Sequence, residues 1–261
     1  VTKKIVRVSS LENAEMIKLI DNSSRDVFFA YANEIARCCD EKGLDANEII
    51  SSGKKYYKRT FLALPGLVGG PCLHKDPYIF SESFKDRNVR TEITLMARKI
   101  NERQPGEIIN FIDKKIKKIK NFPKKFDISV LGLAFKGKPI TDDLRGSMSL
   151  KVFEELKKKF LGSKFYGYDP IVDYNKIKKK KIIPVKNIIA AFKKKNLVII
   201  TNNHIQFSQM NIEKLASNMS SPGIIYDFWN HFSKKKMKLP QNIKYISLGR
   251  HFLFKWKKKI I

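Results

Sequence analysis

Two different spacings of apolar residues divide the chain into a helical first half and a second half in which strands and helices alternate. Between residues 11 and 42, apolar side chains recur every three or four residues, with no proline and no interior glycine before Gly43. The repeat is made of Leu11, Ala14, Ile17, Ile20, Phe28, Tyr31, Ile35 and Cys38. This spacing predicts one long helix that ends at Gly43.

The remainder of the first half is also expected to be helical, interrupted by one long loop. A short helix is predicted over Asp45–Ser51, and prolines and glycines crowd the following loop, Leu64–Tyr78. Apolar periodicity then predicts helices over Arg90–Arg103 and Glu107–Lys120. We expect Gln104-Pro105-Gly106 to separate these two helices, because proline removes a backbone donor and clashes with the preceding turn.

After Asn121-Phe122-Pro123 the pattern changes to short apolar runs that alternate with helical segments. Strands are expected over Asp127–Phe135, Lys164–Tyr168, Leu197–Thr201, Ile224–Asp227 and Ile243–Leu248, and helices near Ser147–Phe160, Val185–Lys194 and Asn211–Met219. This alternation is typical of a parallel sheet covered on both faces. The predicted fold class is therefore α/β, with an all-helical domain over residues 11–120 and a Rossmann-like, doubly wound parallel-sheet domain over residues 121–261.

Positive charge is concentrated in the second half. The net charge is +28, of which residues 1–110 carry +3 and residues 111–261 carry +25. Most of the excess is lysine in short runs: Lys114-Lys115, Lys117-Lys118, Lys157–Lys159, Lys178–Lys181, Lys193–Lys195, Lys234–Lys236 and Lys257–Lys259. Such a field attracts polyanions. However, no zinc-finger spacing, aromatic RNA-binding signature or basic zipper accompanies the runs, so we interpret them as solvated helix faces and nucleic-acid binding as the weaker alternative.

Composition excludes several other classes of protein. A hydrophobic content of 43% excludes global disorder. Three cysteines in 261 residues exclude a disulfide scaffold and fit a reducing cytosol, so we expect a cytoplasmic protein. No apolar run approaches the roughly eighteen residues that a membrane helix needs, and the first residues lead into no signal-peptide core.

The strongest local signal for chemistry is the loop Gly69-Gly70-Pro71-Cys72-Leu73-His74-Lys75-Asp76-Pro77. Paired glycines let the backbone approach a ligand closely. Cys72, with Lys75 nearby to favour the thiolate, is a candidate nucleophile, and Asp76 is a candidate general base. The alternative is an inert cysteine in a turn. Metal binding through Cys72 and His74 is weaker still, because no second pair of ligands has suitable spacing, and we predict no metal site.

Two further segments carry candidate groups. Lys18 and Asn22 are four residues apart and project from one helix face, where together they are able to hold an oxyanion, although an ion pair of Lys18 with Glu15 is the simpler interpretation. The segment Leu131–Ser147 leaves a predicted strand and enters a helix, the position at which open α/β sheets bind nucleotides. In it, Phe135 is placed to pack near a base, and Lys136 and Arg145 to contact phosphate.

Taken together, these segments resemble the UDP-glucose/GDP-mannose dehydrogenase family of nucleotide-sugar 6-dehydrogenases. The matching residues are Glu15–Leu19 with Asn22, Asn33–Ala36, Gly69–Cys72 with Lys75-Asp76, Leu131–Lys136 with Asp143–Arg145, Tyr168–Pro170, Ile200-Thr201 and Asp227. The family uses NAD in two successive oxidations that convert a sugar C6 alcohol to a carboxylate. The resemblance therefore implies a UDP-sugar substrate, either a UDP-hexose or a UDP-N-acetylhexosamine, and a homodimer formed through the long central helix.

The resemblance also assigns roles. Cys72 would attack the aldehyde to give a thiohemiacetal and then a thioester, Lys18 and Asn22 would stabilise the oxyanion, and Asp76 would assist water and proton transfer. Gly69, Gly70, Phe135 and Lys136 would bind the nucleotide sugar, and Lys75 and Arg145 would face the cofactor. Pro71, His74 and Trp229 differ from the commonest residues of the family, so the sugar is left open.

One part of the family pattern has no counterpart in the sequence. Val1–Ser10 resembles only the tail of an N-terminal NAD-binding domain, and no glycine fingerprint of such a domain is present. We therefore expect the central and C-terminal portions of such an enzyme, inactive without a separate NAD-binding partner. The alternative is a non-catalytic remnant that binds nucleotide sugar or dimerises.

Overall fold

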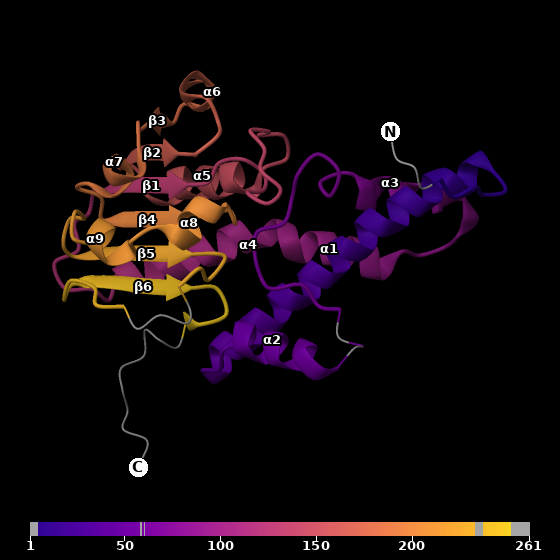
Figure 1. The fold of residues 1–261 in the computed structure, drawn as a ribbon, viewed down its shortest axis with the longest axis horizontal. Coiled ribbons are helices and arrows are strands. Elements are labelled where there is room, and N and C mark those ends of the chain that lie inside the picture. The colour runs from indigo at the N-terminus through magenta and orange to yellow at the C-terminus, as the bar shows by residue number, and fades with distance from the viewer. Residues whose placement is uncertain (1–4, 58, 60, 233–236, 252–261) are drawn as a thin grey trace, which may run out of the picture.

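The computed structural model describes residues 5–57, 59, 61–232 and 237–251 (Figure 1). Its first half contains the helices α1 (Leu11–Lys42), α2 (Ala46–Tyr56), α3 (Asp76–Glu82) and α4 (Glu92–Ile116), with a 3₁₀ turn at Lys85–Arg87. The long first helix is confirmed, and α2 runs further than predicted. The helix α3, which follows the cysteine loop directly, was not anticipated.

The ends of α1 lie where the sequence places them, but the buried face of the helix differs from its apolar repeat. The Ser10 side chain accepts a hydrogen bond from the Asn13 backbone N–H at the start, and Gly43 ends the helix with φ of 73°. Most residues of the repeat, including Ile17 and Tyr31, are exposed. The buried positions are instead small or polar: Asn22, Ser23, Asp26, Ala30, Ala32, Asn33, Ala36 and Cys39.

The break predicted at Gln104-Pro105-Gly106 is wrong, because α4 continues through Pro105 as one helix. A proline inside a helix forgoes one backbone hydrogen bond, and packing on both sides of it compensates here. Ala97 and Ile100 pack against α1, while Ile108, Ile109 and Ile112 belong to the core under the sheet. Tertiary burial therefore overrides the local signal, and α4 connects the two halves of the molecule.

The second half forms a six-stranded parallel sheet in the order β3-β2-β1-β4-β5-β6. Its strands are β1 (Asp127–Leu131), β2 (Lys164–Tyr168), β3 (Ile183–Pro184), β4 (Leu197–Ile200), β5 (Gly223–Asp227) and β6 (Ile243–Ser247). Its helices are α5 (Met148–Lys159), α6 (Tyr174–Lys179), α7 (Ile188–Phe192), α8 (Ile205–Gln209) and α9 (Ile212–Ala216). The predicted doubly wound α/β class is confirmed, and the strand order reverses between β1 and β4.

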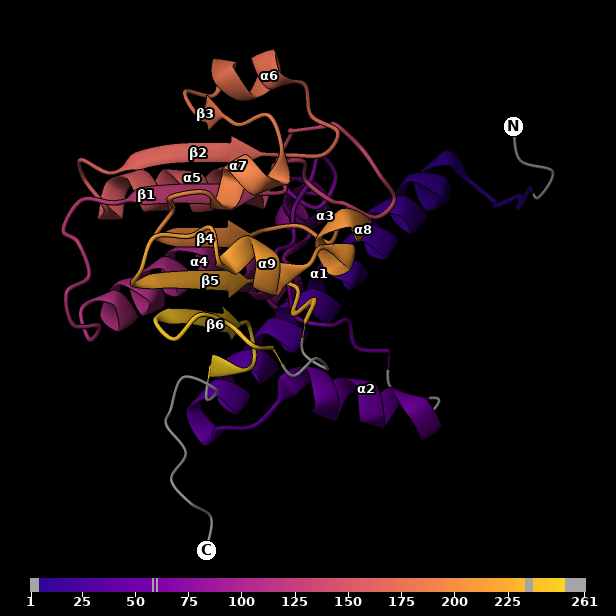
Figure 2. The ribbon, with the colours of Figure 1, turned by 60° about the vertical axis from the view of Figure 1, so that its left-hand side comes forward.

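Helices cover both faces of this sheet (Figure 2). On one face, Ile128 and Val130 of β1 pack with α4 and α5, and on the other Leu131 packs with α7, α8 and α9. Strand β1 ends four residues earlier than predicted, because Gly132 turns the chain with φ of 86°. The short strand β3 and the helices α6 and α8 were not predicted.

The lysine runs do not share one environment. Lys178–Lys181 is exposed, as expected for a solvated face. Lys195 is an exception: its side chain is 7% exposed, lies 3.8 Å from the centre of the Tyr166 ring and approaches Asp127 at 3.6 Å. Lys234–Lys236 and Lys257–Lys259 lie outside the described residues, as do residues 1–4 of the predicted N-terminal segment. Within the described ranges, no helix is long and apolar enough to cross a membrane.

A buried polar cluster joins α1, α4 and the cysteine loop. The Arg98 guanidinium of α4, 1% exposed, donates to Asp26 Oδ1 at 2.8 Å and to the carbonyl oxygens of Leu73 at 2.8 Å and Val68 at 3.0 Å. The Asn101 amide also donates to Asp26 Oδ1, at 2.9 Å. One charged group on α4 therefore fixes both sides of the loop that carries Cys72.

A second amide in this cluster holds the start of the same loop. Asn33 Oδ1 accepts from the Gly66 N–H at 2.9 Å, and Asn33 Nδ2 donates to the Gly66 carbonyl at 3.0 Å and to Asn101 Oδ1 at 2.9 Å. Burial raises the pKa of Asp26 to about 6, although the Arg98 guanidinium and the Asn101 amide act in the opposite direction. The Arg98 guanidinium and the Asn101 amide therefore favour the ionised form of this buried carboxyl.

We expect Arg98→Leu to lower the free energy of unfolding by about 3–5 kcal/mol, because it leaves the Asp26 carboxylate buried without its cation. Urea denaturation measures this difference. The matched control is Arg103→Leu on the same helix, whose exposed ion pair with Glu107 should contribute less than about 1 kcal/mol. Equal losses for the two variants would contradict the importance of the buried pair.

Candidate functional site

The cysteine loop lies directly against the loop that follows β1. The Gly70 N–H donates to the Gly146 carbonyl at 2.8 Å. Gly70 has φ of 102°, and a Cβ there would lie 2.4 Å from the Phe135 ring. A Cβ at Gly69 would lie 2.5 Å from the Gly146 carbonyl oxygen. Both predicted glycines are therefore needed for close contact between the two halves of the molecule, and Phe135 is packed against Gly70.

Cys72 sits at the turn that starts α3. Its carbonyl oxygen accepts hydrogen bonds from the Lys75 N–H at 3.0 Å and the Asp76 N–H at 2.8 Å, and the residue is partly buried. Asp76 is the first residue of α3 and is followed by Pro77, which suits the first turn of a helix. The turn therefore holds Cys72 and Asp76 in a fixed relation to each other.

The structure brings Asn22 and Asp76 together. Asn22 Nδ2 donates to Asp76 Oδ2 at 2.6 Å, and both residues are buried. Lys75 lies beside the other carboxylate oxygen, with its Nζ 4.0 Å from Asp76 Oδ1, and is largely exposed. This contact joins α1 to the cysteine loop 54 positions along the chain.

Lys18 lies one turn before Asn22 on α1 and is exposed. Glu15 and Lys18 are both described by the structure, and they form no ion pair with each other. The simpler interpretation of this lysine is therefore wrong for this structure. Its side chain remains available on the same face of α1 as Asn22.

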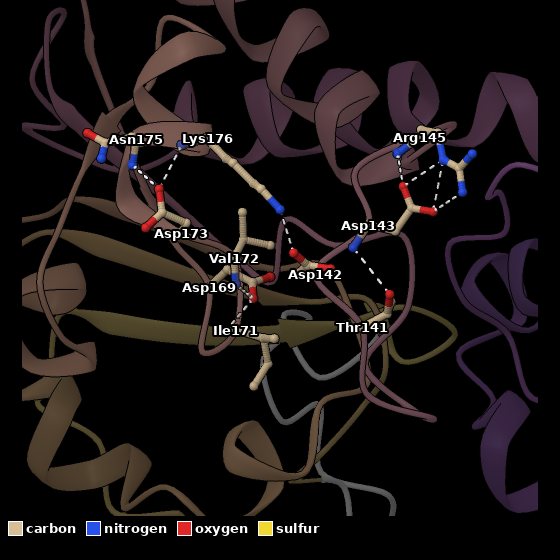
Figure 3. Close-up of polar contacts among 10 residues, drawn as sticks. All are labelled: Thr141, Asp142, Asp143, Arg145, Asp169, Ile171, Val172, Asp173, Asn175 and Lys176. Carbon is tan, nitrogen blue, oxygen red and sulfur yellow. Dashed lines mark hydrogen bonds and ion pairs between the residues drawn. The ribbon is translucent and has the colours of Figure 1, made fainter.

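Buried carboxylates shape the loop after β1. Asp169, next to the end of β2, accepts hydrogen bonds from the backbone N–H groups of Leu133 at 2.7 Å and Ala134 at 2.9 Å with one oxygen. Its other oxygen accepts from the N–H groups of Ile171 and Val172 (Figure 3). The backbone just before Phe135 and Lys136 is therefore fixed from the neighbouring strand. Lys136 Nζ lies 5.0 Å from the centre of the Phe135 ring.

Arg145 points away from this carboxylate and pairs with Asp143 within the same loop (Figure 3). Its Nε and Nη2 bind the two Asp143 oxygens at 2.8–3.1 Å, and its side chain is 78% exposed. Asp143 raises the pKa of Arg145, and the charge of a Cys72 thiolate adds to this effect. Asp143 therefore occupies one edge of the Arg145 guanidinium. Lys176 of α6 pairs with the neighbouring Asp142.

Two of the cavities border the cysteine loop or the loops at the carboxyl ends of the strands. One, of about 530 Å³, is lined by His74, Glu102, Leu144, Arg145, Gly146, Ser147, Met148, Leu150, Lys151, Glu154 and Lys180. The other, of about 750 Å³, opens at the carboxyl ends of β1, β4 and β5 and is lined by Phe29, Ala63, Leu64, Gly137, Lys138, Pro139, Ile140, Asn203, Ile205, Ser208, Trp229 and His231. The second lies at the reversal of strand order, where open α/β sheets bind ligands.

Sequence reasoning missed two polar groups that the site depends on. Arg98 lies in a helix that its sequence marks only by apolar periodicity. His231 contacts the buried carboxylate of Asp227 four residues earlier, with Nδ1 and Oδ1 2.9 Å apart. An acidic residue and a histidine at this spacing are too common to be a signal. In the described part of the chain, no group of three or more His, Cys, Asp or Glu residues is placed to hold a metal ion.

The contact between Gly70 and Phe135 predicts the effect of a single methyl group. Gly70→Ala should lower the free energy of unfolding by about 1–3 kcal/mol, because the new Cβ meets the Phe135 ring in a backbone conformation that disfavours L side chains. Chemical denaturation measures the loss. Gly53→Ala in α2 is the control, since its Cβ meets no atom within 4 Å and should stabilise the helix by about 0.5–1 kcal/mol.

Comparisons with known proteins agree with this geometry. Residues 12–103 match the model of the UDP-glucose/GDP-mannose dehydrogenase family, central domain, and residues 129–234 match that of the same family, UDP binding domain. The chain is 32% identical over 219 residues to a UDP-N-acetyl-D-mannosamine dehydrogenase of Pyrococcus horikoshii, covering 84% of this chain and 48% of the relative. It is 29% identical over 223 residues to a UDP-N-acetyl-D-glucosamine 6-dehydrogenase of Salmonella typhi, covering 85% and 51%.

Solved structures give the same result. The UDP-D-ManNAc dehydrogenase of Pyrococcus horikoshii superposes with a TM-score of 0.80 and 29% identity, over 96% of this chain and 55% of that one. The UDP-N-acetyl-mannosamine dehydrogenase Cap5O of Staphylococcus aureus has a TM-score of 0.74 and 26% identity, over 94% and 53%. The chain spans about half the length of the curated relatives it matches. On the evidence of its fold, its loop contacts and these matches, the chain belongs to the UDP-glucose/GDP-mannose dehydrogenase family.

Proposed function

We propose that this chain is part of an NAD-dependent nucleotide-sugar 6-dehydrogenase that converts the C6 alcohol of a UDP-hexose or UDP-N-acetylhexosamine to a carboxylate. The observation that carries the proposal is the 2.6 Å contact between Asn22 and Asp76. It places the amide of α1 and the carboxylate of α3 beside the loop that holds Cys72. The names of the relatives, which are dehydrogenases of UDP-N-acetylhexosamines, support the substrate class.

In the proposed reaction Cys72 is the nucleophile for the second oxidation. Its thiolate adds to the C6 aldehyde, a C–S bond forms, and the carbonyl electron pair moves onto oxygen to give a thiohemiacetal. Loss of a hydride from C6 leaves a thioester, and attack of water on the thioester carbon releases the carboxylate and restores the thiol. NAD, when bound, accepts one hydride in each of the two oxidations.

Asn22, Lys18 and Asp76 have separate roles in this proposal. The Asn22 amide and the Lys18 ammonium donate to the C6 oxygen, where negative charge develops when the thiolate or water adds. Asp76 is already an acceptor from Asn22, and it removes a proton from the attacking water. Burial of Asn22 and Asp76 strengthens these interactions, because few water molecules compete for the same groups.

The nucleotide is proposed to bind where the two halves of the molecule meet. Gly69 and Gly70 bring the cysteine loop against the loop after β1 beside the bound sugar, with Gly146 on Gly69 and Phe135 on Gly70, and the Lys136 ammonium contacts phosphate. The cavity at the carboxyl ends of the strands would then receive the nucleoside. Its lining is mainly apolar, as expected for a pocket that covers a base.

The residues present fit one part of the cofactor. Arg145, Lys151 and Lys180 line the smaller cavity together with Glu102 and Glu154, and Arg145 pairs with Asp143 and Lys151 with Glu154. In this proposal Lys180, Lys75 of the cysteine loop, and Arg145 once it leaves Asp143 contact the pyrophosphate of NAD. We propose that the rest of NAD is held by a domain outside these 261 residues, either in the same polypeptide or in a separate chain. This agrees with the share of its relatives that the chain covers.

The catalytic proposal predicts the outcome of a reconstitution. Mixing the chain with a separately expressed NAD-binding domain of a relative should restore NADH formation from a UDP-sugar, with two NADH per carboxylate. Cys72→Ala should lower carboxylate formation about 10³-fold or more, because no thioester is able to form. Cys38→Ala, which removes an exposed cysteine of α1, is the control and should leave the rate unchanged. Full turnover by the Cys72→Ala variant would contradict the proposed mechanism.

We also propose that the chain forms a homodimer through α1 and α4. Tyr31, Ile93 and Met96 are at least 54% exposed and line a largely apolar groove of about 680 Å³ between these helices. A second copy would cover them and gain the hydrophobic free energy of burial.

The dimer proposal predicts the sedimentation of one variant. Met96→Glu should shift the chain from dimer to monomer in sedimentation velocity, because a carboxylate would be buried at the contact. Leu161→Glu is the control: that residue is 78% exposed, lies outside the groove and should not change the mass of the particle. A wild-type chain that sediments as a monomer at all concentrations would contradict the proposal.

The second candidate function is a non-catalytic protein that binds nucleotide sugar. The observations that favour it are the match of residues 129–234 to the UDP binding domain of the family and the cavity at the carboxyl ends of the strands, neither of which requires the cofactor. Both candidates require UDP-sugar binding in calorimetry, but the second predicts no NADH in the reconstitution.

A further inference from the structure

The amino ends of the strands form an edge of the sheet that faces away from the cysteine loop, because the strand arrows point toward the helical half of the molecule (Figure 1). The chain enters the strands at this edge through the segments 117–127, 160–164, 193–197, 217–223 and 240–243. Together these segments hold nine lysines, and their one acidic residue is Asp127. The edge is therefore strongly basic.

Most of these lysines have no acidic partner. Lys117 pairs with Asp113 at 2.8 Å, and the buried Lys195 approaches Asp127 at 3.6 Å. The other seven are exposed and form no ion pair with a described residue: Lys118, Lys120, Lys124, Lys125, Lys164, Lys193 and Lys194. The fold leaves the positive charge of these seven side chains unbalanced.

The fold also holds the segments together as one surface. The Phe126 N–H donates to Ser163 Oγ at 3.4 Å, and the Lys194 N–H donates to the Asn218 carbonyl at 2.9 Å. Strands β2, β1 and β4 are direct neighbours, so their amino ends span only about 10 Å. The sequence presents the lysines as separate solvated runs. The structure joins the seven unpaired ones into one surface, the basic end of the sheet.

An exposed apolar side chain lies within the basic end of the sheet. Leu161, in the loop between α5 and β2, is 78% exposed. The next residue, Gly162, lies against Lys125, since a Cβ at Gly162 would be 3.0 Å from Lys125 Cε. Lys164 follows in the same loop. This surface therefore presents a leucine beside lysines to the solvent.

The side chains of this surface favour an anionic lipid bilayer over a nucleic acid. Lysine is a point charge on a flexible stem and suits mobile head groups, and an apolar side chain among lysines is able to enter the interface. Proteins that bind nucleic acids also use arginine, which binds phosphate with two hydrogen bonds, and aromatic rings, which stack on bases. The five segments contain no arginine. Their rings Phe122, Phe126 and Phe160 pack on one another, with centroids 5.0 and 5.2 Å apart.

We propose that the basic end of the sheet is a docking surface for a bilayer that carries anionic lipids. The lysines lie over the head groups, and Leu161 enters the boundary with the acyl chains. Binding through charge and one apolar side chain is reversible and sensitive to salt. The groove between α1 and α4 involves the first turns of α4, whereas the last turn leads to the basic end. The bound chain therefore keeps this groove accessible.

The test measures cosedimentation of the full chain with vesicles of phosphatidylcholine and phosphatidylglycerol in equal amounts. The wild type should bind these vesicles, should not bind vesicles of phosphatidylcholine alone, and should be released at about 0.5 M NaCl, because salt screens the surface charge. The combined substitution of Lys124→Gln, Lys125→Gln and Lys164→Gln should weaken binding about 10²-fold, since each lysine near an anionic surface contributes about fivefold.

The matched control removes the same charge from the helical half. Lys42→Gln, Lys54→Gln and Lys55→Gln, combined, change exposed lysines of α1 and α2 and should keep the affinity within about threefold of the wild type.

A substitution of the apolar side chain separates a bilayer from other polyanions. Leu161→Ser leaves the charge unchanged and should weaken vesicle binding about tenfold, because the leucine no longer enters the interface. It should not alter binding of a short DNA duplex, which has no apolar interior.

The outcomes decide the proposal without NAD or a nucleotide sugar, so they are independent of the proposed function. If the wild type does not bind the anionic vesicles, or if the triple lysine variant of the basic end binds them as tightly as the wild type, the docking surface is wrong. If Leu161→Ser binds the vesicles as tightly as the wild type, the surface is a general polyanion site and the bilayer assignment is wrong.

Discussion

The buried ion pair between Arg98 and Asp26 is the interaction on which the candidate site depends. A guanidinium and a carboxylate that are both 1% exposed lose most of their hydration, so each is stable there only while the other remains. Arg98 also donates to the Leu73 carbonyl from Nη1 and to the Val68 carbonyl from Nη2, and its Nε lies 3.4 Å from Glu102 Oε1. The loop that carries Cys72 is thereby attached to α4 at both ends, with little freedom to move independently of it.

Helix α4 transfers this constraint to the sheet. Its first half packs on α1 and its second half on the face of the sheet, so the cysteine loop has a defined position relative to the loop after β1. The two loops then meet through backbone atoms: Gly70 and Gly146 are hydrogen-bonded, and Phe135 covers Gly70. Such a contact tolerates no side chain, which explains why glycines, and not larger residues, occupy it.

At the carboxyl ends of two strands, a buried aspartate fixes the loop that follows. Asp169 after β2 and Asp227 at the end of β5 each accept hydrogen bonds from backbone N–H groups of the chain that follows. Asp169 also fixes the loop after β1, which leads to Phe135 and Lys136. The backbone N–H groups of these loops have no partner in a helix or strand. The carboxylates accept their hydrogen bonds, so the N–H groups are not buried unpaired. Asp227 also holds His231 in the cavity wall.

Apolar periodicity and turn residues act locally, so they are enough to predict the helical first half, the parallel α/β second half and the loop that holds Cys72. The predicted helix break at Pro105 is wrong, because packing on α1 and on the sheet keeps α4 continuous there. The apolar repeat also fails to predict which face of α1 is buried. The buried positions are Asp26, Asn33 and their small neighbours. The contacts of Asn22 with Asp76, of Arg98 with the cysteine loop and of His231 with Asp227 appear only in the folded chain. Hydrogen bonds between distant polar groups leave no periodic trace in the sequence, so only the folded chain reveals them.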